Sequence, residues 1–143
     1  MQFIQHDFLQ NFDAAFRAKD KDMLDDILND EISKLIVFDK DRLVKAIADC
    51  KIPVDPNINN TALAKLINNN IKTNKKFRER ITKLILTNNN SANRQFKDKK
   101  GQMSLTRMLD QSMYMSFTAA NEPMLLKRVS KHSEQSKYVN LSD

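Results

Sequence analysis

The sequence of 143 residues contains one glycine, three prolines, one cysteine and no tryptophan. Glycine and proline supply most tight turns, so their scarcity disfavours a multi-stranded sheet and favours helices. A single cysteine excludes a disulfide within the chain, and the helical pattern around Cys50 predicts a small core residue. The sequence has no apolar run of membrane-spanning length and no signal-peptide pattern at its N-terminus. We therefore expect neither membrane insertion nor secretion by that route.

Residues that support catalysis or metal binding are also scarce. His6 and His132 lie near opposite ends of the chain without neighbouring cysteines, so we predict no zinc site. Asp20, Asp22 and Glu31 match three positions of a calcium loop, but one oxygen ligand and the required glycine are missing. A single glycine also disfavours a phosphate-cradling loop or a strained nucleophile turn. We predict a protein that is not an enzyme and that uses no cofactor, metal or small-molecule substrate.

Apolar residues recur at steps of three and four, which is the spacing of one helical face. Phe8, Phe12 and Phe16, for example, share one face of an expected first helix. We predict an all-α fold, a single compact multi-helix bundle of about six to seven helices. The helical patterns cover 3–19, a segment capped by Asp20 or Asp22, a separate short stripe from Ile32, 38–50, 61–70, 74–87, 104–120 behind Ser104, and a last segment from Glu122.

Charge is distributed unevenly along the chain. Residues 1–60 carry 8 basic and 12 acidic side chains, a net charge of −4, whereas residues 61–143 carry 16 and 6, a net charge of +10. Pro53 and Pro56 interrupt the helical pattern between these parts. We expect one helical domain, 1–132, with an acidic half, 1–52, a proline-containing junction, 53–56, and a basic half, 57–132, followed by a polar C-terminal tail, 133–143.

The positive charge is concentrated in residues 72–100, which hold ten basic and two acidic side chains. In the helical part, Phe77, Ile81 and Leu84 are expected to face the core, and cations cover the remaining arc. This density matches the footprint of a phosphate backbone, although a solvated lysine-rich face is the simpler alternative. The candidate contact residues for nucleic acid or an acidic partner are Lys75, Lys76, Arg78, Arg80, Lys83, Arg94, Lys97, Lys99 and Lys100.

The segment 104–120 is a second candidate surface. Its apolar residues spread over roughly 200° of the helix circumference, about twice the usual stripe. Five of the seven methionines lie between 103 and 124, and such flexible side chains suit contacts with several neighbours. We expect another subunit to cover part of this helix and to receive apolar residues of the tail. The candidate interface residues are Met108, Met113, Met115, Phe117, Tyr138 and Leu141.

These patterns predict a non-enzymatic structural or assembly protein, with copies of itself or other subunits as partners. The acidic half of one copy is expected to dock on the basic half of the next. A composition rich in asparagine, lysine and isoleucine is typical of AT-rich coding sequences. Together with the lack of catalytic residues, it suggests a small subunit of a bacteriophage virion, associated with the capsid, neck or tail. We therefore expect the chain in a virion or in the host cytoplasm.

The alternative is a small helical DNA- or RNA-binding regulator that uses residues 72–100. The helices at 61–70 and 74–87 suggest a helix-turn-helix, with basic residues early in the second helix. The connecting sequence NNNIKTN is longer than the usual tight turn. The aromatic residues near this block are Phe77, expected in the core, and Phe96, which leaves little for stacking on bases.

Overall fold

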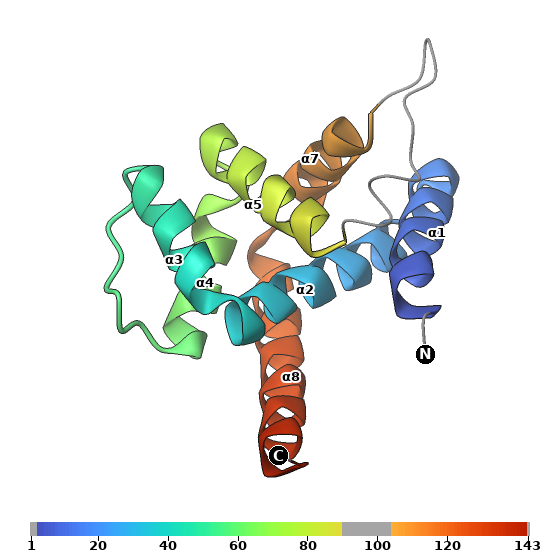
Figure 1. The fold of residues 1–143 in the computed structure, drawn as a ribbon. Coiled ribbons are helices and arrows are strands. Elements are labelled where there is room, and N and C mark those ends of the chain that lie inside the picture. The colour runs from blue at the N-terminus through green and yellow to red at the C-terminus, as the bar shows by residue number, and fades with distance from the viewer. Residues whose placement is uncertain (1–2, 90–103, 143) are drawn as a thin grey trace.

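The computed structural model describes the backbone of residues 3–89 and 104–142, and the side chains of 8–89 and 104–136. Within these ranges the fold is all-helical, as predicted, with seven α-helices, one short 3-10 helix and no strand (Figure 1). No helix of this described part is long and apolar enough to cross a bilayer. The elements are α1 (Phe3–Ala18), α2 (Lys21–Phe38), α3 (Lys40–Asp49), α4 (Asn60–Asn70), α5 (Lys75–Asn88), α7 (Leu105–Ser116), η1 (Ala119–Asn121) and α8 (Glu122–Ser142).

The central element is α2, which contacts α1, α3, α4, α5, α7 and α8. It is one helix of 18 residues, whereas the sequence analysis expected a separate stripe from Ile32. Neither glycine nor proline interrupts it, and several of its polar residues bond within the helix or to neighbouring segments. Asn29 Nδ2 donates to the carbonyl of Asp25 at 2.7 Å, and Ser33 Oγ donates to the carbonyl of Asp30 at 2.7 Å. The helix is therefore continuous and is buried on several sides.

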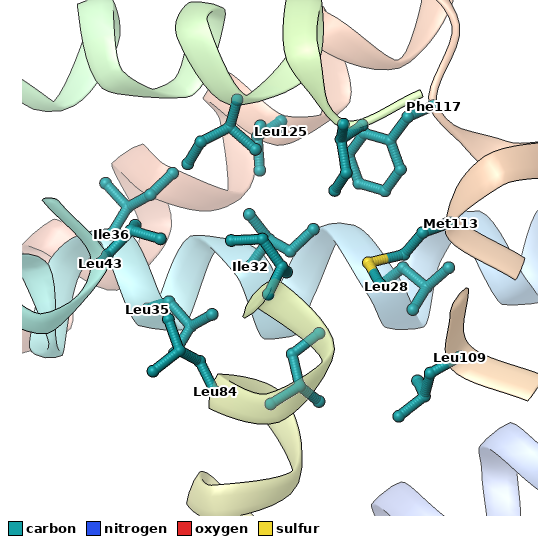
Figure 2. Packing of buried hydrophobic residues seen from close by; sticks show 14 of the residues in the cluster. Leu28, Ile32, Leu35, Ile36, Leu43, Leu84, Leu109, Met113, Phe117 and Leu125 are labelled. Carbon is teal, nitrogen blue, oxygen red and sulfur yellow. The ribbon is translucent and has the colours of Figure 1, made fainter. Parts of the chain in front are cut away.

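One hydrophobic core joins the two charge halves. Figure 2 shows Leu28, Ile32 and Leu35 of α2 grouped with residues of α5, α7 and α8, such as Leu84 and Met113. Burying each such side chain contributes about 1.5 to 3 kcal/mol relative to exposure. The acidic and basic halves are therefore parts of the same packed structure.

Polar residues fix the starts of four helices. Each cap oxygen accepts a hydrogen bond from the backbone N–H three residues later, which satisfies a group that the helix itself leaves free. Ser104 caps α7 in this way, as predicted, at 3.2 Å from the N–H of Arg107. The other three caps are Asp20 of α2, Asn59 of α4 and Asn74 of α5.

The C-terminal region differs from the predicted layout. The helix expected over 104–120 ends at Ser116, because Phe117 leaves helical geometry with φ −85° and ψ 93°. Asn121 Oδ1 then accepts from the N–H of Thr118 at 2.9 Å, which holds a short turn before α8. The segment expected as a polar tail continues α8 to Ser142, whose last turns extend beyond the other helices in Figure 1.

Candidate polyanion-binding surface

The packing of α5 sets the orientation of its basic face. Phe77, Ile81 and Ile85 are fully buried and Leu84 is nearly so, as the helical spacing predicted. Opposite them, Lys75, Lys76 and Lys83 are exposed. Because the apolar side is held in the core, the backbone positions that carry these three lysines are fixed on the surface.

Arg78 does not belong to this exposed face, and its predicted role as a contact residue is corrected here. Its side chain is 7% exposed and makes three hydrogen bonds within the protein. Nη1 donates to the carbonyls of Ile71 at 3.2 Å and Lys72 at 2.8 Å, and Nε donates to Asp110 Oδ1 at 3.2 Å. Arg78 therefore holds the end of α4 and the side of α7 against α5.

A basic groove of about 300 Å³ lies between α3 and α5. Arg42 and Lys45 line it from α3, and Arg80 and Lys83 line it from α5. Asp49 is the acidic residue of this lining, and it pairs with Arg80 at 3.5 Å. Sequence analysis missed Arg42 and Lys45 because they lie in the half with net negative charge.

A larger groove of about 720 Å³ lies on the other side of α5, against α7. Lys75 and Arg107 supply positive charge here, while Glu79 and the Arg78–Asp110 pair also line it. Tyr114 of α7 borders the same groove and is 51% exposed. The two grooves extend the basic face of α5 onto both neighbouring helices. We call this area the cationic surface: Arg42, Lys45, Lys75, Lys76, Arg80, Lys83 and Arg107.

One group of charged residues outside the cationic surface is bonded between α2 and α8. Asp30 of α2 contacts His132 Nε2 at 2.8 Å and Arg128 Nη1 at 3.4 Å, and Arg128 also pairs with Asp26. These bonds join the acidic and basic halves within one chain. Carboxylates that are bonded within the chain are less available to another copy. The predicted docking of the acidic half on a neighbouring copy therefore has fewer acidic groups to use.

Lys34 belongs to the same bonded group. Its ammonium lies 3.2 Å from Glu31 Oε2 and 3.4 Å from Asp30 Oδ2. Burial opposes the charged form of Lys34, but the two carboxylates outweigh it, so the pKa of Lys34 is raised above its usual value. Asn89 Nδ2 of α5 donates to the other oxygen of Glu31, Oε1, at 2.8 Å.

The methionine-rich helix is mostly an internal surface. Met108, Met113 and Phe117, predicted to meet a partner, are at most 5% exposed and lie in the core of this chain. The wide apolar face of α7 is covered by α2 and α5, on two sides. Met115, 50% exposed, is the predicted interface residue that does face solvent.

Six of the predicted contact and interface residues have side chains outside the part of the chain that the structure describes. Tyr138 and Leu141 belong to α8, but their side chains are outside the described residues. Arg94, Lys97, Lys99 and Lys100 are outside the described backbone as well. Among the described residues, no three histidine, cysteine or acidic side chains are grouped so as to hold a metal ion.

A scan against protein-family models and searches of curated proteins and solved structures gave no match to this chain.

Proposed function

We propose that this chain is a non-enzymatic assembly protein that binds the phosphate backbone of a nucleic acid through its cationic surface. The observation that carries the proposal is the extension of the basic face of α5 onto α3 and α7. Within the described residues, Lys45, Lys75, Lys76, Lys83 and Arg107 take part in no salt bridge. Their charge is thus available to phosphates, whose bound counterions they would release.

The side chains on this surface favour binding to the backbone over reading of bases. Lysine acts on phosphate as a flexible point charge, whereas base edges are read mainly by paired donors and acceptors of arginine, asparagine and glutamine. The cations exposed on α5 are Lys75, Lys76 and Lys83, and Arg80 is engaged by Asp49. Binding without sequence preference suits a subunit that lies against packaged nucleic acid, as in the bacteriophage particle expected from the sequence.

A salt titration with a fluorescent duplex tests this proposal. We expect affinity to fall steeply between about 50 and about 200 mM salt, because each phosphate contact adds about 0.9 to the slope of log K against log salt. The variant Lys45→Glu/Lys83→Glu should lower that slope by about 2. Its matched control is Lys65→Glu/Lys127→Glu, which changes net charge equally at exposed positions on α4 and α8.

Three outcomes contradict the proposal. One is no binding of duplex or single strand at low salt. Another is an equal loss in the two double variants, which would assign the effect to net charge instead of the cationic surface. The third is tighter binding of polyglutamate than of nucleic acid, which would identify an acidic protein as the partner.

A sequence-reading regulator is the second candidate, and one observation favours it. Because α4 extends to Asn70 and α5 begins at Lys75, the connection has four residues, which is within the range of helix-turn-helix turns. Arg78 fixes this turn through the carbonyls of Ile71 and Lys72. Selection of bound duplexes from a random pool decides between the candidates. A selected site bound at least about 1,000-fold tighter than bulk DNA would favour the regulator.

A further inference from the structure

We infer that Tyr114 is a stacking site for an unpaired base, so that the nucleic acid bound by the cationic surface is single-stranded. This inference rests on the proposed function and adds the class of nucleic acid. Tyr114 is on α7, far in sequence from the basic residues of α5, but it borders the same groove as Lys75 and Arg107. Half of its surface is exposed.

Two cations of the protein lie close to the ring of Tyr114, which remains 51% exposed. The Cζ atom of Arg78 lies 5.1 Å from the ring centre, and Nζ of Lys72 lies 5.7 Å from it. Arg78 is itself fixed by its bonds to Asp110 and to two backbone carbonyls. Cations near an aromatic face are attracted to it. A ring that is already positioned loses little conformational entropy when a base stacks on it.

The groove beside Tyr114 has the size and polarity that a nucleotide requires. Its volume of about 720 Å³ is within the range of small-molecule sites, which is about 300 to 1,000 Å³. Thr106, Gln111 and Glu79 offer hydrogen-bonding groups along its wall, and Lys75 and Arg107 offer positive charge for the flanking phosphates. An aromatic ring within a cationic groove is the usual arrangement in proteins that bind single strands.

The class of nucleic acid follows from access to the base. Within a duplex, each base is stacked on its neighbours, so its flat face is unavailable to a protein side chain. In a single strand the bases separate and stack on aromatic rings. Since Tyr114 lies on the surface beside cations, its contact with a base requires an unpaired nucleotide.

Binding of three labelled probes of equal length, oligothymidylate, an abasic strand and a duplex, tests this inference. We expect oligothymidylate to bind about tenfold tighter than the abasic strand, which corresponds to stacking of one base. Tyr114→Leu should remove this difference while leaving the affinity for the abasic strand unchanged. Tyr114→Phe, which keeps the ring, should preserve the difference. Phe38→Leu is the matched control, because Phe38 is an exposed aromatic that packs on His132 of α8.

Photocrosslinking gives an independent readout. With 5-iodouracil in the strand, we expect the adduct on the tryptic peptide 108–127, in which Tyr114 is the one tyrosine. Equal binding of all three probes by wild type and Tyr114→Leu, or a crosslink elsewhere, overturns the inference and leaves the proposed function standing. Loss of binding to every probe at low salt overturns the proposed function itself. Circular dichroism melting of each variant separates a local effect from unfolding.

Discussion

Two regions of the molecule contain similar charged side chains with different bonding. One is the contact between α2 and α8, and the other is the cationic surface on α3, α5 and α7. In the first, Asp30 of α2 bonds to both Arg128 and His132 of α8. In the second, Lys75, Lys76 and Lys83 extend from a helix whose opposite side is buried, and no described carboxylate pairs with them. Charges in the first region join helices, whereas the three lysines of the second are exposed to solvent.

This contrast between bonded and exposed charges shows how a basic stretch of sequence should be interpreted. Net charge identifies where cations are frequent, but the packing of each helix decides which of them reach solvent. Arg78 and Lys75 are three residues apart on α5, yet one is buried in a network and the other is exposed. Predictions about function should therefore be made for individual side chains rather than for the block.

The largest expected effect is on the core around α2. Leu28→Ala removes a fully buried side chain of the core cluster shown in Figure 2, and should lower the free energy of unfolding by about 2 to 5 kcal/mol. Urea denaturation followed by circular dichroism measures the change. The control is Met23→Ala on the exposed side of α2, which should stay within about 0.5 kcal/mol of wild type. Equal effects of the two substitutions would contradict the central position of α2.

Arg78→Met sharpens the comparison within α5 itself. It should lower stability by about 1 to 3 kcal/mol, because Asp110 and two backbone carbonyls lose their donor. Lys83→Met, the control on the same helix, should leave stability within about 0.5 kcal/mol but weaken binding to nucleic acid. The comparison fails if Lys83→Met destabilises the chain as much as Arg78→Met does.

Features that depend on residues close together in the chain could be predicted from the sequence. Spacing alone placed Phe77 and Ile81 on the buried side of α5, and the polar residue before an apolar run located the cap at Ser104. Features that depend on packing between distant segments were missed. Arg42 and Tyr114 join the cationic surface because α3 and α7 pack on either side of α5, which no local pattern reveals.

Two predictions, for α2 and for α7, differ from the structure. The apolar stripe from Ile32 was predicted as a separate segment, yet it continues α2, and Asp30 and Glu31 before it bond to His132 of α8 and to Asn89 after α5. The apolar excess of α7 predicted that Met108 and Met113 would face a partner, yet both are buried in the core of this chain. In both cases the missing information was which helix lies opposite, and this depends on the tertiary fold.

A smaller effect is expected at the bonded charges between α2 and α8. Asp30→Asn removes the negative charge that contacts Arg128 and His132, and should cost about 0.5 to 1.5 kcal/mol of stability, since these groups are partly exposed. Thermal melting compares it with Glu134→Gln, an exposed carboxylate of α8 with no described ion pair. Binding to nucleic acid should be unchanged by either substitution, and a change in binding would mean that the two regions are not functionally separate.

The smallest effect should appear at Lys34, as a dependence on pH. The folded state raises the pKa of Lys34, so its pairing with Glu31 and Asp30 stabilises the fold below the ordinary lysine value of 10.5, and this stabilisation is lost as pH rises through the higher folded value. Lys34→Met should cost about 0.3 to 0.5 kcal/mol at neutral pH, as expected for a partly exposed helical pair. The difference from wild type should shrink above about pH 10.5. Lys127→Met is the control, at an exposed site without a described ion pair, and should show no such trend. If the loss of stability in Lys34→Met stays constant with pH, the role of Lys34 is packing of its side-chain stem instead of ion pairing.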